Sequence, residues 1–249
     1  MELFTEIWRR ASSVQPAPPP ALIALVAAAG FALVALPSIW PYTRMIVTIT
    51  HEGSHAAAAL LTGRRLHGVR LHTDTSGLTV SSGRPSGPGM IITLLAGYLG
   101  PALAGLAAVG LLTAGRGLAL LWLLVIMLAL MLLQIRNFYG VAVIVGCAAV
   151  LIAVSWYFSA TAQSTLAYLL TWILLIAAPK PVLELIRQRR GGRARHSDAD
   201  QLARLTPVPA PLWVVFFLVV NSAGLIVGTS LLLPALLQLV VTAGRLVSG

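Results

Sequence analysis

The sequence predicts an all-α polytopic membrane protein with about seven transmembrane helices and a small β-hairpin-like insertion after the second span. Three observations predict this class. Hydrophobic residues make up 58% of the 249 residues, and charged residues make up only 10%. A water-soluble domain of this length needs more charge to cover its surface. The apolar residues also gather into runs of about twenty, the length that a bilayer requires.

Seven apolar runs account for most of the chain. Residues 1–20 form an amphipathic start with a Pro-rich end, and residues 21–245 are expected to form one membrane domain. The first run ends in PSIWPY without a small-residue cleavage motif, which favours a retained span over a signal peptide. The expected spans are residues 21–40, 42–62, 89–113, 118–135, 140–158, 164–185 and 211–241.

The segments between these runs are short, with two exceptions. Residues 63–88 are polar and Gly-rich, and residues 187–209 form a basic linker that is expected to be cytoplasmic. Prolines should interrupt two of the spans. We expect Pro179 and Pro181 to kink the last turns of the sixth span, and Pro234 to break the last run.

The arginines predict an orientation. With a cytoplasmic N-terminus, the loops after spans two, four and six are cytoplasmic, and they carry most of the positive charge. These loops contain Arg64, Arg65, Arg70, Arg84, Arg136 and the cluster between residues 187 and 204. Cytoplasmic loops are rich in Lys and Arg, so we expect a multi-pass cell-membrane protein with a cytoplasmic N-terminus. The basic residues behind the net charge of +10 fall in short clusters between apolar runs, as orientation in a membrane requires, so no nucleic-acid partner is expected.

The second span contains ionisable residues in the pattern HEGSH. His51 and His55 are four residues apart, so on a helix their imidazoles share one face. In H-E-x-x-H motifs two neutral imidazoles hold Zn²⁺, and the glutamate, here Glu52, takes a proton from the zinc-bound water. Ionisable groups cost several kcal/mol inside a span, which favours a metal site. The alternative is a polar cluster that links helices.

Three segments resemble those of a known family. HEGSHAAAALLTG, GVRLHTDTSGLTV and AGYLGPALAG follow one another as they do in site-2-protease-type intramembrane zinc metallopeptidases. The chain is most similar to the compact B-like branch, in which an S-D-A-D-like segment follows a basic linker; here it is HSDADQLARLT. The resemblance extends from about Met45 to Thr206. It implies hydrolysis of peptide bonds in or beside the membrane, with His51 and His55 as zinc ligands and Glu52 as base.

The third zinc ligand is harder to place. Better-known members of the family use the aspartate of an L-D-G motif, and they carry an asparagine after the Gly-Pro of the third span; this chain has neither. Among its seven acidic residues, we rank Asp198 first, Asp200 second and Glu184 third. Asp198 has a second interpretation, as part of a helix N-cap with the preceding serine. His67 and His72 are further candidates, although surface roles are commoner for such histidines.

The loop after the second span predicts a substrate site. GVRLHTDTSGLTV alternates apolar and polar residues on each side of a DTSG turn, as a β-hairpin does. An exposed edge near Val69 and Leu71 could pair with an unwound substrate segment; a re-entrant plug is an alternative compatible with this one. Asn137 or Asn221 could donate to an oxyanion, although interhelical bonding is the commoner role.

The predicted function is that of an intramembrane zinc metalloendopeptidase. Its partners would be a membrane protein or peptide substrate and the lipid bilayer, and its cofactor Zn²⁺. The missing third-ligand motif leaves a catalytically silent membrane scaffold or regulatory protein as the alternative. A transporter is disfavoured, because spans other than the second carry few ionisable residues and no inverted repeat is evident. The preference for Arg over Lys, with abundant Ala and Leu, suggests a GC-rich bacterial genome.

Overall fold

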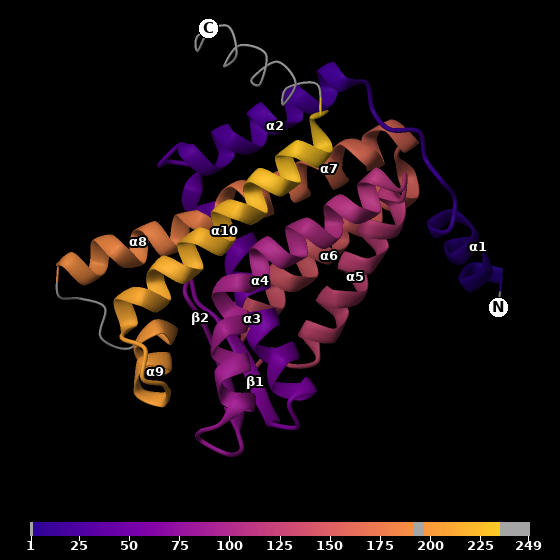
Figure 1. Cartoon of the computed structure of the whole chain (residues 1–249). Coiled ribbons are helices and arrows are strands. Elements are labelled where there is room, and N and C mark those ends of the chain that lie inside the picture. The colour runs from indigo at the N-terminus through magenta and orange to yellow at the C-terminus, as the bar shows by residue number, and fades with distance from the viewer. Residues whose placement is uncertain (1, 192–196, 235–249) are drawn as a thin grey trace, which may run out of the picture.

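The computed structural model describes residues 2–191 and 197–234, and these form a helical bundle with one small sheet (Figure 1). This confirms a mostly helical membrane protein with a hairpin insertion. In chain order the elements are α1 (Glu2–Ala11), α2 (Pro20–Ala35), α3 (Trp40–Leu61), β1 (Arg65–Leu71), β2 (Gly77–Ser82), α4 (Pro88–Thr113), α5 (Gly117–Leu132), α6 (Phe138–Tyr157), α7 (Ala160–Ala177), α8 (Pro179–Arg190), α9 (Asp198–Leu205) and α10 (Ala210–Leu232).

The count of seven spans is not confirmed. Within the described residues, four segments are long and apolar enough to cross a membrane: α4, α6, the continuous stretch of α7 and α8, and α10. Helices α2 and α3 pass the same test only as a pair bent by 98°, which is the geometry of a broken span or a re-entrant loop. Helix α5 has 16 residues, fewer than a straight crossing needs.

The bend between α2 and α3 has a local cause. Leu36 ends α2 with an extended backbone, φ −70° and ψ 120°, and Pro37 follows it. A proline disfavours the helical conformation of the residue before it and cannot continue the hydrogen-bond ladder. The apolar pattern runs on through this corner, and for that reason the sequence suggested two full spans.

The kink predicted at Pro179 and Pro181 does not separate α7 from α8. Ala178, between them, has helical dihedrals, φ −53° and ψ −44°, and Ala160–Arg190 counts as one continuous span. The predicted break of the last run does lie near its proline. Helix α10 ends at Leu232, two residues before Pro234. The remainder of the predicted last span lies outside the described residues.

The N-terminal segment lies at the end of the bundle opposite the hairpin. The side-chain oxygen of Gln15 accepts a hydrogen bond of 3.1 Å from the backbone N–H of Leu118. The backbone N–H of Gln15 donates to the carbonyl of Gly115 at 2.8 Å. At the other end, the N–H of Arg136 donates to the carbonyl of Val69 at 2.9 Å. If the arginine-rich hairpin end is cytoplasmic, the N-terminus is not. The predicted cytoplasmic N-terminus is therefore not supported.

The hairpin is paired along more than one edge. Strands β1 and β2 are antiparallel, from the pair Arg65–Ser82 to the pair Leu71–Gly77. The second edge of β1 is covered by the segment after α5, where the N–H of Val69 donates to the carbonyl of Gln134 at 2.8 Å. Strand β1 is therefore an internal strand, and β2 is the strand that faces the cavity described below.

Helix α9 is held in place by a hydrophobic cluster. Ala199 and Leu202 are fully buried against Leu185 of α8 and Phe217 of α10. Figure 1 shows α9 below α8, on the hairpin side of the bundle. This packing brings the start of α9 to the middle of α3, where the HEGSH motif lies.

Candidate metal centre

The two motif histidines point their Nε2 atoms at the same place. Their Nε2 atoms are 3.1 Å apart, and the rings are nearly perpendicular, at 84°. The Nδ1 atom of His55 lies 2.7 Å from the carbonyl oxygen of Thr93 in α4. Because a carbonyl only accepts hydrogen bonds, this contact places the proton on Nδ1 and leaves Nε2 of the neutral ring with a free lone pair.

Asp198 completes the cluster from another part of the chain. Its Oδ2 atom lies 3.2 Å from Nε2 of His55 and 3.5 Å from Nε2 of His51. Burial of the Asp198 carboxyl opposes its ionisation, but the two neighbouring imidazoles lower its pKa overall. In the described part of the chain, these three residues form the one group of His, Cys, Asp and Glu side chains spaced to hold a metal ion.

The spacing of the three atoms fits a tetrahedral zinc site. Zinc binds imidazole nitrogen and carboxylate oxygen at about 2.0–2.2 Å, so two ligand atoms of a tetrahedron lie roughly 3.3 Å apart. The three distances here are 3.1, 3.2 and 3.5 Å. Two imidazoles and one carboxylate are also a ligand set that catalytic zinc sites use, and they leave the fourth position open.

Glu52 lies beside the cluster and is held by the hairpin. Its side chain is buried, and its Oε2 accepts a hydrogen bond of 2.6 Å from the hydroxyl of Thr79 in β2. A Cβ atom on Gly77, also in β2, would lie 2.7 Å from Oε1 of Glu52. Only glycine therefore lets the strand approach this carboxylate so closely.

Helix α4 supplies the space for the imidazoles. A Cβ atom on Gly97 would collide with Nε2 of His55 and lie 2.8 Å from Cε1 of His51. The next residue, Tyr98, places its ring edge-on to His51 with the centroids 5.0 Å apart. In the AGYLG segment, Gly97 thus leaves space for the imidazoles, and the ring of Tyr98 packs against one of them.

Sequence reasoning missed the supporting residues. Thr79 and Gly77 lie in a loop that we interpreted as a substrate edge or a re-entrant plug, and Thr93 and Gly97 lie in the third span, to which we gave no role at the metal site. The close spacing of glycines in AGYLG was the signal available for Gly97. Nothing in the sequence pairs Thr79 with Glu52.

The lower-ranked ligand candidates have other partners. Asp200 accepts hydrogen bonds from Arg189 and from Ser197, and Ser197 and Asp200 together form the capping box of α9. The capping role considered for Asp198 therefore belongs to its neighbours. Glu184 accepts a hydrogen bond of 2.7 Å from the indole of Trp40.

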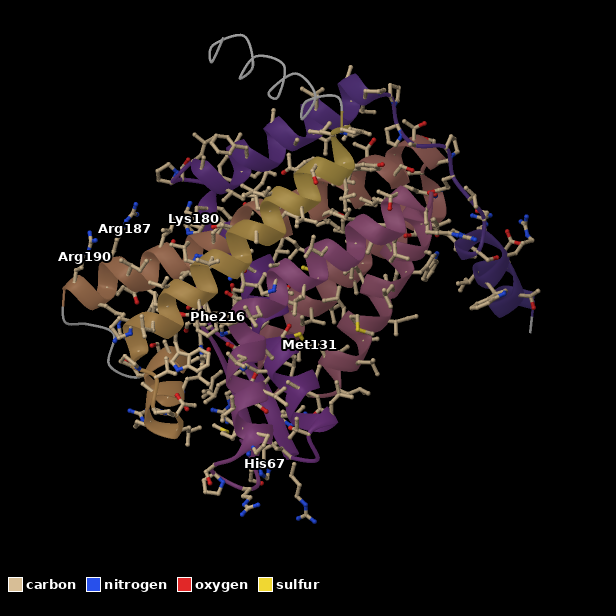
Figure 2. The ribbon with its side chains drawn as sticks, in the orientation of Figure 1. His67, Met131, Lys180, Arg187, Arg190 and Phe216 are labelled. Carbon is tan, nitrogen blue, oxygen red and sulfur yellow. The ribbon has the colours of Figure 1, made fainter. Side chains whose placement is uncertain are left out.

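The two candidate histidines of the hairpin lie elsewhere. His67 contacts the hydroxyl of Ser82 at 2.6 Å, and Figure 2 shows it at the lower extremity of the molecule. His72 lies 3.2 Å from the hydroxyl of Ser76 in the turn. Neither belongs to the group around Asp198.

The residues expected to bind substrate need correcting. Val69 and Leu71 are fully buried, with 0% of their surface exposed. The amide of Asn137 donates to the carbonyl of Leu71 at 2.7 Å and accepts from its N–H at 3.2 Å. All three residues join β1 to the connection between α5 and α6, because the edge of β1 that we expected to be free is occupied.

Asn221 has the interhelical role. It is fully buried in α10, and its amide donates to the carbonyl of Tyr98 in α4 at 3.1 Å. It thereby joins the two helices behind the aromatic wall of the site.

Two cavities adjoin the cluster. The larger, of about 560 Å³, is lined by the three clustered side chains, Glu52, residues 77–81 of β2, and parts of α4 and α9. The smaller, of about 190 Å³, shares His51 and Glu52 and extends toward Arg44. An extended peptide lying along β2 in the larger cavity would pass beside both Glu52 and the candidate metal position.

A comparison with protein families matches most of the chain. The model of the family described as Peptidase M50B-like matches residues 22–228. This range contains the histidines, Glu52, the hairpin and Asp198. Comparisons with curated proteins and with solved structures each gave no match.

Proposed function

The chain belongs to the Peptidase M50B-like family, a site-2 protease family, and on this premise we propose that it is an intramembrane zinc metalloendopeptidase. Its substrates would be membrane-embedded or membrane-adjacent segments of other proteins. One observation carries the proposal. The carboxylate of Asp198 meets the two histidines of the motif at the spacing of a tetrahedral zinc site.

In this proposal His51, His55 and Asp198 hold the metal. Bound zinc would supply a Lewis acid that polarises the scissile carbonyl and lowers the pKa of water. Thr93 keeps the proton of His55 on Nδ1, so that Nε2 faces the metal position. Gly97 leaves the volume into which both imidazoles extend.

Glu52 acts as the general base. It stands next to the cluster and outside the ligand group, as the glutamate of an H-E-x-x-H motif does. Thr79 occupies its Oε2, which leaves Oε1 to accept the proton of the attacking water. After the tetrahedral intermediate forms, the same carboxyl can deliver that proton to the leaving amine.

Strand β2 is the proposed substrate edge, in place of β1. Its residues line the larger cavity, and Leu78 and Val80 are 49% and 44% exposed. An added strand gains main-chain hydrogen bonds and is held extended. An extended backbone exposes the peptide bond, which a transmembrane helix otherwise shields.

The silent-scaffold alternative rested on the missing L-D-G motif. Asp198 supplies a carboxylate beside the two histidines without that motif, so the absence of the motif no longer argues against catalysis. The proteolytic function is therefore the one that the geometry favours.

Metal analysis and a cleavage assay test the proposal together. The detergent-purified protein should contain a single zinc ion per chain and should cleave a candidate membrane substrate only in that form. His51→Ala and His55→Ala should lose the zinc, because two protein ligands hold it weakly. His67→Ala is the matched control, since His67 lies away from the site. Full zinc content in either motif variant would contradict the proposal.

A further inference from the structure

We propose that Arg189 is a positioning residue for the third metal ligand: it acts through Asp200 to fix the first turn of α9 and with it the carboxylate of Asp198. The inference rests on the proposed function, because it takes Asp198 to be a zinc ligand. It assigns a role to an ion pair outside the site itself.

The candidate site is assembled from two separate pieces of the chain. His51 and His55 lie on the continuous helix α3, whereas Asp198 is the first residue of α9. Helix α9 has only eight residues, and isolated helices of that length are not stable in water. The position of Asp198 therefore depends on the tertiary contacts that hold α9.

Apolar packing fixes the depth of α9 but leaves its rotation less well determined. Ala199 and Leu202 are fully buried in the cluster formed with α8 and α10. Such burial is favourable but non-directional. A small rotation of α9 could keep much of this burial and still move Asp198 away from the histidines.

Asp200 supplies the directional contacts. Its Oδ1 accepts a hydrogen bond of 2.7 Å from Nη1 of Arg189 in α8. Its Oδ2 accepts from the backbone N–H and the hydroxyl of Ser197, at 3.0 and 2.6 Å. One carboxylate thus ties the end of α8 to the residue immediately before Asp198.

The helical geometry links the two aspartates. Residues two positions apart lie about 200° apart around an α-helix, so Asp198 and Asp200 project from opposite sides of α9. Asp198 faces the histidines while Asp200 faces α8. Holding one of them in place sets the direction of the other.

The ion pair is shielded enough to be effective. The Arg189 and Asp200 side chains are 24% and 15% exposed. Nη1 of Arg189 and Oδ1 of Asp200 are 2.7 Å apart. This is the spacing of a short charge-assisted hydrogen bond, which is stronger and more directional than a neutral one.

The neighbouring arginines provide a matched control. Arg187 and Arg190 are exposed, and Figure 2 shows both at the outer side of α8. Arg190→Glu introduces the same charge change as Arg189→Glu, one residue away and without the contact to Asp200. Arg189→Lys is the conservative variant that retains the charge.

The experiment measures zinc affinity by competition with a chelator in detergent, and the visible spectrum of the Co²⁺-substituted protein. We expect Arg189→Glu to weaken zinc binding by about three- to tenfold and to alter the cobalt spectrum. Arg189→Lys should stay within about twofold of the wild type, and Arg190→Glu should match the wild type. A merely structural role would lower the melting temperature of the metal-free protein and leave affinity and spectrum unchanged.

Two results would overturn the inference: wild-type zinc affinity in Arg189→Glu, or an equal loss in Arg190→Glu. Asp198→Ala, measured in parallel, separates this failure from that of the proposed function. If Asp198→Ala loses zinc and Arg189→Glu does not, only the positioning role is wrong. If Asp198→Ala binds zinc as the wild type does, both proposals are wrong.

Discussion

The hydroxyl of Thr79 donates a hydrogen bond of 2.6 Å to Oε2 of Glu52, and so the hairpin is joined to the motif that it follows in sequence. The same hydroxyl lies 3.1 Å from the backbone carbonyl of Glu52. The strand that we propose as the substrate edge therefore also holds the proposed base. If a substrate binds along β2, its binding can change the orientation of Glu52.

Glu52→Gln should abolish cleavage and leave zinc content unchanged, because Glu52 is proposed as a base and not as a ligand. Loss of a general base costs roughly 10²- to 10⁴-fold in rate. The measurements are turnover of a membrane substrate and metal analysis of the same preparation. Cleavage at the wild-type rate would show that another group takes the proton.

Thr79→Val should have a smaller effect of the same kind. It removes one hydrogen bond to a charged group, worth about 1.5–3 kcal/mol, so kcat/KM should fall by roughly ten- to a hundredfold. Thr79→Ser retains the hydroxyl and should stay close to the wild type. If Thr79→Ser lost as much activity as Thr79→Val, the methyl group and not the hydrogen bond would be what matters.

Asp198→Ala should lower zinc affinity and activity together. The variant retains two histidine ligands, fewer than the three that catalytic zinc normally has. Glu184→Gln is the comparison, since Glu184 contacts Trp40 and Arg44 instead of the cluster. Isothermal titration of the metal-free proteins with zinc gives both affinities, and a tight site in Asp198→Ala would exclude the carboxylate from the ligand set.

Much of the fold could be predicted from the sequence, because apolar runs and turn residues are local signals. The hairpin that was predicted from the alternation around the DTSG turn is confirmed. The span count could not be predicted in the same way, because a run of apolar residues does not reveal a 98° bend. The prolines of PSIWPY, Pro37 and Pro41, are the local signs of that corner, and prolines are equally compatible with a simple loop.

For the candidate site, the sequence could identify residues, but it could not predict that Asp198 lies beside His51 and His55. The spacing of His51 and His55 places them on one helical face whatever the tertiary structure is. The contact of Asp198 with them depends on the packing of α9 against three other helices, and its ranking came from a family resemblance and from the scarcity of acidic residues. The partners of Val69 and Leu71 were missed because the segment that covers β1 lies more than sixty residues away in the chain.

Gly97→Ala should damage the metal centre through steric overlap. The added Cβ would collide with His55 and crowd His51, and overpacking of this kind costs about 1–3 kcal/mol. We expect weaker zinc binding and a lower melting temperature. Gly110→Ala, in the same helix, is the control, because nothing lies within 4 Å of its added Cβ and alanine favours a helix by up to about 1 kcal/mol over glycine.

Equal zinc affinities and melting temperatures in Gly97→Ala and Gly110→Ala would contradict the packing argument. If Gly97→Ala bound zinc as tightly as Gly110→Ala, the imidazoles would have room that the structure does not give them. A melting temperature lowered in both would point instead to a general sensitivity of α4.

The N-terminal segment and the hairpin should lie on opposite sides of the membrane. Gln15 is hydrogen-bonded to the connection between α4 and α5, at the far end of the bundle from β1, whereas the sequence alone predicted that both are cytoplasmic.

Single cysteines at Ser13 and at His67, each in a Cys147→Ser background, can be labelled in intact cells with a membrane-impermeant maleimide. We expect labelling at residue 13 without permeabilisation, and at residue 67 only after it, because the arginine-rich hairpin end should face the cytoplasm. A cysteine replacing Ser159, in the connection between α6 and α7, should label like the one at residue 13. If neither cysteine, at residue 13 or at residue 67, is labelled in intact cells, both lie in the cytoplasm. That result would mean that residues 21–62 cross the membrane twice, as the sequence predicted.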